Sequence, residues 1–155
     1  MNRLILNYLG AFFILLSILS FFNIIYSYYF NLYLNIDTYF YTFLISFIIG
    51  IASFIKNKIE VKITIYTKIF VVIIGYLSIP LIISIPYYFS IYNLSFINSY
   101  FESMSGFTST GFTVFENIKH LDQSLILWRS TSQWIGGIYF LISILLLIDI
   151  FDDKL

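Results

Sequence analysis

The sequence contains no cysteine and very little charge. Its 155 residues include eight Lys or Arg, eight Asp or Glu and one His, so the formal net charge is zero. The absence of cysteine excludes disulfides, thiolate metal sites and a cysteine nucleophile. Because a chain without net charge has no overall basic field, we expect no nucleic-acid partner.

Apolar residues dominate what is present. They make up 60% of the chain, while charged residues make up 10%. A soluble domain carries about 25% charged residues, and a soluble core cannot absorb this much apolar surface. The composition therefore indicates an all-α integral membrane protein surrounded by lipid.

Long charge-free stretches separate the few charges. Four of them can each hold the ~20 apolar residues that cross a bilayer as a helix. They predict transmembrane helices near residues 5–30, 38–55, 66–90 and 124–149. Pro80 is expected to kink the third helix, and Pro86 is expected to lie near its outer end.

Basic residues predict the orientation of these helices. Four lysines, against one Glu60, cluster around the link between the second and third helices: Lys56, Lys58, Lys62 and Lys68. By the positive-inside rule this link is cytoplasmic. Two crossings separate it from the N-terminus, and the fourth helix returns to the same side. Both termini are therefore expected to be cytoplasmic, and residues 91–123 external.

Residues 91–123 are expected to be more than a simple loop. Apolar residues recur there at helical spacing and predict a short helix over about 94–107, with Ser95 as its N-cap. This helix is too short to cross a bilayer, and it runs into SGFTSTGFT, residues 105–113. A re-entrant segment has this pattern, because non-helical backbone is tolerated at membrane depth only inside protein or beside water.

The stretch Thr108-Ser109-Thr110-Gly111-Phe112 has the composition of an ion selectivity filter. Backbone carbonyl oxygens can replace the water of a potassium ion, and glycine permits torsions that turn consecutive carbonyls to one side. Small hydroxyls add oxygens without a fixed charge. From the residues alone, a polar external turn between two helices explains the stretch equally well.

Residues 101–141, FESMSGFTSTGFTVFENIKHLDQSLILWRSTSQWIGGIYFL, resemble the first pore loop and following helix of the TrkH/KtrB superfamily of potassium transporter membrane subunits, TrkH most of all. The shared motifs are Thr-x-Thr-Gly, Trp-Arg-Ser and Gln-Trp-x-Gly-Gly. The resemblance implies potassium uptake across the bacterial plasma membrane, with carbonyls of 108–112 forming one filter strand. It divides the chain into an N-terminal helix pair, 1–62, and a first helix–pore loop–helix repeat, 63–155.

The resemblance also implies partners. The family arranges four such repeats around one pore, so three further repeats or identical copies must complete the filter. Members form homodimers and bind a cytoplasmic nucleotide-binding regulatory subunit (TrkA-like), through which any nucleotide would act. We expect no cofactor in this chain and K⁺ only as the transported ion. Because DIFDDKL departs from the family's link to its second repeat, we interpret the chain as a fragment or truncated product; a subunit that assembles fourfold is the alternative.

Two charges and two glycines are the expected supports of the filter. Glu102 either attracts cations or, as we favour, is a structural carboxylate behind the filter. Arg129 either positions the pore loop, through Glu102, Glu116 or loop carbonyls, or reaches the outer interface, and both interpretations stay open. Gly136 and Gly137 either form a flexible point or, as we favour, permit close helix packing.

The other polar and aromatic residues are given ordinary roles. His120 is expected to be solvated, Asp122 or Ser124 to cap the last helix, and Trp128 and Trp134 to pack or lie at the interface. A solvated helix end is expected for the tail carboxylates Asp149, Asp152 and Asp153.

Two rival functional classes remain. The first is a truncated, non-conducting membrane remnant or scaffold subunit. The second is an intramembrane enzyme, which we disfavour. The sequence has no Gly-x-Ser-x-Gly elbow and no His-Glu-x-x-His pair, and its one histidine lies in a predicted external loop. We therefore expect a transport protein rather than an enzyme.

Overall fold

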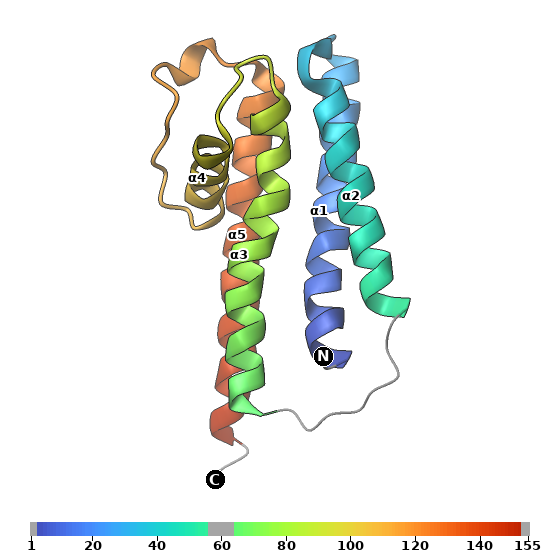
Figure 1. Ribbon diagram of the computed structural model, residues 1–155, viewed down its shortest axis with the longest axis vertical. Helices are drawn as coiled ribbons and strands as arrows, with labels where there is room; N and C mark the ends of the chain where they lie inside the picture. Colours follow the sequence, from blue (N-terminus) through green and yellow to red (C-terminus); the bar gives the residue numbers. More distant parts are fainter. Residues whose placement is uncertain (1–2, 56–63, 153–155) are drawn as a thin grey trace.

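The computed structural model describes residues 3–55 and 64–152, which are helical apart from short connections (Figure 1). Four long helices are joined by one short helix and two 3-10 turns. They are α1 (Arg3–Tyr29), η1 (Tyr33–Asn35), α2 (Ile36–Ile55), α3 (Ile65–Phe89), α4 (Phe96–Phe107), η2 (Ile118–His120) and α5 (Gln123–Asp152). The all-helical prediction is confirmed for these ranges, which contain no strand. The predicted bounds are correct to within a few residues.

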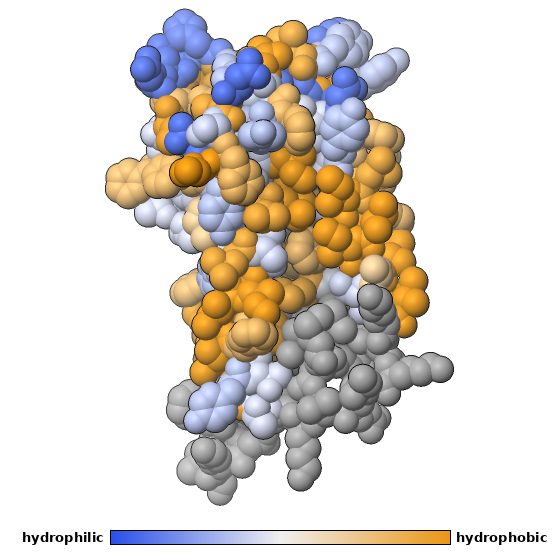
Figure 2. Space-filling model, viewed as in Figure 1, coloured by the Kyte–Doolittle hydropathy of each residue, from blue (hydrophilic) through white to orange (hydrophobic). Residues whose placement is uncertain are grey.

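The four long helices can all cross a membrane, judged by length and composition. Within the described ranges the candidate spans are Asn7–Tyr29, Tyr33–Ile55, Ile65–Phe89 and Gln123–Ile148. Figure 2 shows apolar side chains over the middle of the visible face, with hydrophilic residues gathered at its upper end. This distribution agrees with a protein embedded in a membrane.

The helices form two antiparallel pairs. α1 packs along α2, and α3 lies beside α5, with α4 beside the upper parts of α3 and α5 (Figure 1). The start of α1, the end of α2, the start of α3 and the end of α5 share the lower end of the figure. This alternation agrees with the predicted order of crossings. Lys56, Lys58, Glu60, Lys62 and Asp153 lie outside the described residues, as do the side chains of Asp149 and Asp152.

α3 continues through both of its prolines, and Pro86 lies in its last turn, as expected. Proline cannot donate a backbone hydrogen bond and opens the helix turn that precedes it. In each case a carbonyl of that turn accepts a side-chain donor from a neighbouring helix. The hydroxyl of Tyr100 on α4 donates to Leu77 O (3.1 Å), and the indole of Trp128 on α5 donates to Ile83 O (3.1 Å). These two bonds join α4 and α5 to α3 beside its prolines.

A buried polar cluster joins the N-terminal helix pair to the start of α5. The amide Nδ2 of Asn35 donates to Asp122 Oδ2 (3.0 Å), which also accepts the hydroxyl of Ser124 (2.6 Å). Ser124 shares a further hydrogen bond with the hydroxyl of Tyr39 on α2 (3.0 Å). Asp122 immediately precedes α5, as expected of an N-cap, but its carboxylate contacts these side chains instead of the first amides of the helix. The cluster therefore positions the first turn of α5.

Candidate functional site

α4 begins after a capping serine and ends in close contact with α5. The hydroxyl of Ser95 accepts the amide of Asn98 (3.3 Å), which confirms Ser95 as the N-cap. At the other end α4 packs directly on α5. A Cβ at Gly106 would overlap the hydroxyl of Ser132, and a Cβ at Gly136 would overlap the carbonyl of Phe107. Small residues on both helices therefore bring the end of α4 against α5.

The two adjacent glycines of α5 differ in their surroundings. Gly136 is buried against Phe107, whereas a Cβ at Gly137 would meet nothing within 4 Å. Gly137 faces a cavity of about 430 Å³ beside the start of the loop. The cavity is lined by Tyr76, Phe107, Thr108, Ser109, Gly136, Gly137 and Phe140. Close helix packing, the role that we favoured for both glycines, therefore fits Gly136. Gly137 lines the cavity instead.

The loop that follows α4 exposes residues 108–112 and folds back on α4. Ser109 and Gly111 have positive φ angles of 56° and 82°, so both residues adopt left-handed backbone conformations. The amide of Thr110 donates to Ser105 O (3.0 Å), and the hydroxyls of Thr108 and Thr110 hydrogen bond to each other. Glycine adopts φ 82° without the steric strain that a side chain would add.

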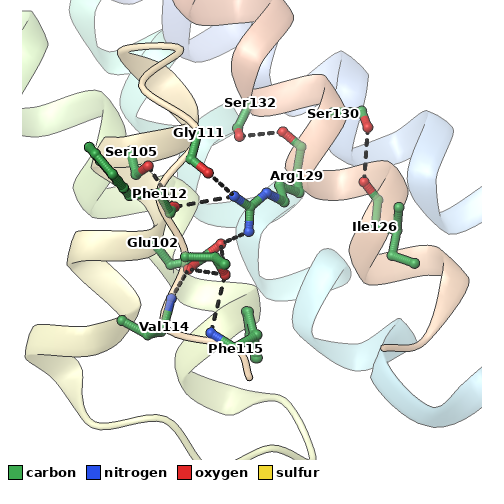
Figure 3. A network of polar contacts seen from close by, with 11 residues as sticks. Glu102, Ser105, Gly111, Phe112, Val114, Phe115, Ile126, Arg129, Ser130 and Ser132 are labelled. Carbon is green, nitrogen blue, oxygen red and sulfur yellow. Dashed lines mark hydrogen bonds and ion pairs between the residues drawn. The ribbon is translucent and has the colours of Figure 1, made fainter. Parts of the chain in front are cut away.

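A buried ion pair lies behind this loop (Figure 3). Glu102 on α4 is fully buried, Arg129 on α5 is 8% exposed, and the two side chains form an ion pair. The Glu102 carboxylate also accepts the hydroxyl of Thr113 (3.0 Å) and the amide of Val114 (3.0 Å). Figure 3 shows the two charged groups pointing toward each other from separate helices. A buried charge is tolerated when it is paired and hydrogen bonded in this way.

Arg129 also reaches the loop itself. Its Nη2 donates to Gly111 O and to Phe112 O, both at 3.2 Å. Of the interpretations left open for Arg129, the geometry matches loop positioning through Glu102 and loop carbonyls. Glu116 is exposed and does not contribute to this network. Glu102, buried and hydrogen bonded behind the loop, has the structural position that we favoured.

Sequence reasoning missed Ser105 and Thr113 as parts of the site. Ser105 holds the loop at two points, because its carbonyl accepts Thr110 N and its hydroxyl donates to Phe112 O (2.7 Å). Thr113 donates to Glu102 and accepts the amide of Phe115 (3.1 Å). A signal was present in the sequence: the hydroxyl-Gly-Phe-Thr pattern occurs twice, as SGFT at 105–108 and TGFT at 110–113.

The remaining expectations near the site are simple to place. His120 is exposed in η2. Trp128 is buried and Trp134 is 60% exposed, consistent with packing and surface positions. Within the described part of the chain, no three His, Cys, Asp or Glu residues group together as they would around a metal ion.

Residues 35–152 match the model of the TrkH family, described as cation transport protein. The chain belongs to this family. The resemblance of residues 101–141 to TrkH is thereby confirmed at the level of the family. The match covers most of the chain, including α2, α3, α4 and α5.

Curated relatives of the TrkH-family chain are transport proteins by name. It is 44% identical over 59 residues to an uncharacterized cation transporter of Methanocaldococcus jannaschii, covering 38% of this chain and 12% of that protein. It is 40% identical over 72 residues to the Trk system potassium uptake protein TrkI of Halomonas elongata, covering 46% and 13%. It is 41% identical over 46 residues to the Trk system potassium uptake protein TrkG of Escherichia coli, covering 30% and 10%.

These alignments span about an eighth of the relatives' length. No solved structure matches the chain.

Proposed function

We propose that this chain supplies one strand of a potassium selectivity filter in a TrkH-like uptake system. One observation carries the proposal: the exposed loop 108–112 is held from behind by the buried ion pair of Glu102 and Arg129. A filter needs backbone oxygens that face an ion path and a rigid support that keeps them there. The names of two curated relatives, both potassium uptake proteins, support potassium as the ion.

The position of α4 supports a re-entrant pore helix. α4 has 12 residues, too few to cross a bilayer, and it lies beside two helices that are long enough to do so. Its loop returns toward α5 along the same side of the bundle (Figure 1). Helix α3, the segment 90–122 and α5 then form one helix–pore loop–helix repeat within residues 63–155, and residues 1–62 form a separate helix pair.

We further propose that this repeat works inside the plasma membrane with both termini in the cytoplasm and the loop toward the outside. A single strand cannot surround an ion, so three further repeats or three identical copies must face the same axis. Homodimers and a cytoplasmic nucleotide-binding regulatory subunit belong to this proposal as partners. Any nucleotide would act on the pore through this regulatory subunit.

Replacement of Gly111 tests the filter. At φ 82° a branched side chain is strained, so Gly111→Val should distort the strand even though nothing lies within 4 Å of its Cβ position. In the assembly that contains this chain, we expect Rb⁺ uptake or its preference over Na⁺ to be lost. The matched control is Ile118→Val in the exposed turn η2, which should leave uptake unchanged. Unchanged selectivity in Gly111→Val would contradict the filter assignment.

The rival function, a non-conducting remnant or scaffold, is tested with the unmodified chain. The mass of the purified protein in nanodiscs counts its copies, and Rb⁺ flux measures conduction. Four copies with flux would fit a symmetric filter. A stable assembly that contains all its repeats and carries no flux would favour the scaffold.

A further inference from the structure

We propose that an ordered water molecule binds between Asn23 and Ser27 on α1 and holds the Asn23 amide in the orientation that joins α1 to α5. The amide Nδ2 of Asn23 donates to Ser124 O at 3.3 Å, so this side chain connects the N-terminal helix pair to the first turn of α5. The water site lies away from the loop 108–112 and is independent of the proposed filter.

Two polar atoms of α1 are buried without a hydrogen-bond partner. Asn23 and Ser27 are both fully buried. Within residues 3–55 and 64–152, no group forms a hydrogen bond with Asn23 Oδ1 or with Ser27 Oγ. A buried polar group without a partner costs free energy, and lipid tails cannot supply the partner that is needed. Both atoms therefore require a ligand that these residues do not provide.

The hydroxyl groups around Asn23 have no hydrogen left to donate to it. Each hydroxyl carries one hydrogen. Ser20 donates its hydrogen to Tyr39 O at 2.7 Å. Ser124 donates its hydrogen to Asp122 Oδ2 at 2.6 Å. In the 3.0 Å contact between the hydroxyls of Tyr39 and Ser124, Tyr39 must therefore be the donor. All three hydrogens are used, and none can reach Asn23 Oδ1.

A water molecule matches the two atoms in position and in chemistry. Asn23 and Ser27 are four residues apart on one helix, so they share a face, with about 5–6 Å between their Cβ atoms. The amide oxygen can only accept, whereas the serine hydroxyl can also donate. One water can donate to Asn23 Oδ1 and accept the hydrogen of Ser27. A metal cation could not accept that hydrogen. Buried waters commonly satisfy polar groups of this kind.

The water also determines which way the Asn23 amide points. The carbonyl of Ser124 can only accept a hydrogen bond, so the NH₂ group of Asn23 must point toward α5. The amide oxygen then points the other way, where only the water can donate to it. Satisfying this oxygen stabilises the contact between α1 and α5.

A structure of the assembly that contains this chain, at a resolution that shows ordered water, tests the site directly. We expect one water within hydrogen-bonding distance of both Asn23 Oδ1 and Ser27 Oγ. A direct hydrogen bond between Ser27 and Asn23 in place of the water would overturn the proposal. A cation or a side chain of another subunit at this position would also overturn it.

Thermal unfolding of the purified protein in detergent tests the contribution of the water. If the Ser27 hydroxyl binds water, Ser27→Ala loses that bond and should lower the unfolding temperature. If the hydroxyl had no partner, its removal would relieve a desolvation cost, and the unfolding temperature would stay the same or rise. The sign of the shift therefore distinguishes a bound water from an unsatisfied hydroxyl.

Ser17→Ala is the matched control. Ser17 is also buried on α1, but its hydroxyl donates to Ile14 O of the same helix at 2.7 Å. Both variants exchange the same residue types within one helix, so the difference in helix propensity cancels between them. We expect a lower unfolding temperature for Ser27→Ala than for Ser17→Ala. An equal or higher temperature for Ser27→Ala would overturn the stabilising role of the water.

Discussion

The indole N–H of Trp128 donates to the carbonyl oxygen of Ile83, with 3.1 Å between Nε1 and O. Ile83 lies in the turn of α3 before Pro86, and Trp128 immediately precedes Arg129 on α5. One hydrogen bond therefore joins α5, one residue before Arg129, to the turn of α3 that precedes Pro86. Arg129, the next residue, donates to the carbonyls of Gly111 and Phe112.

Loss of the Trp128 donor should destabilise the fold. Trp128→Phe keeps a ring in the core but leaves Ile83 O without its side-chain donor, and Trp128 is only 1% exposed. The net contribution of one such hydrogen bond is about 0.5–1.5 kcal/mol. Thermal unfolding of the purified protein in detergent measures the change. Trp134→Phe, at a site that is 60% exposed, should leave the unfolding temperature nearly unchanged. Equal effects in the two variants would contradict the prediction.

The same substitution should destabilise the protein at one glycine of α5 and not at the other. In Gly136→Ala the added methyl overlaps Phe107 O, so α4 must move away from α5; overpacking of this kind costs about 1–3 kcal/mol. In Gly137→Ala the methyl enters open space. We expect a lower unfolding temperature for Gly136→Ala alone. A comparable loss in Gly137→Ala would show that the helix needs flexibility there instead of close packing.

Replacing one partner of the ion pair should destabilise the protein more than replacing both partners. Glu102→Gln leaves Arg129 charged and 8% exposed, and breaking a buried pair costs about 3–5 kcal/mol. Replacing both residues by Gln should cost less than this single change. Denaturant or thermal unfolding of the three variants forms a double-mutant cycle. Glu116→Gln, at an exposed carboxylate, is the control and should have little effect. Additive losses at Glu102 and Arg129 would disprove the coupling.

The contact between the N-terminal helix pair and α5 should depend on the charge of Asp122. Asp122→Asn keeps the shape but weakens the bonds from Asn35 and Ser124, and a hydrogen bond to a charged group contributes about 1.5–3 kcal/mol. Hydrogen exchange should rise in the first turn of α5 and near η1. Asp37→Asn, exposed at the start of α2, removes only a helix-dipole interaction of about 0.3–1 kcal/mol. Equal exchange in both variants would contradict this account.

Local features of the sequence predicted the positions of the helices. Charge-free stretches located α1, α2, α3 and α5, because a bilayer requires a fixed length of apolar helix. Helical spacing and the Ser95 cap located α4 within two residues of its observed start. The bracing roles of Ser105 and Thr113 were not predicted, because each depends on how the loop folds back onto α4. Nothing in the adjacent pair Gly136-Gly137 indicated that only the first would meet Phe107.

By itself, the sequence determined the membrane class, the helices and the polar loop that interrupts them, since these follow from composition and from periodicity along the chain. Only the tertiary structure shows that Arg129 contacts Glu102 and two carbonyls of the loop. Glu102 and Arg129 are far apart in the sequence, and no local pattern states that they meet. The end of α4 against Gly136 brings them together, and burial then requires that the two charges pair. The same packing places the guanidinium at Gly111 O and Phe112 O.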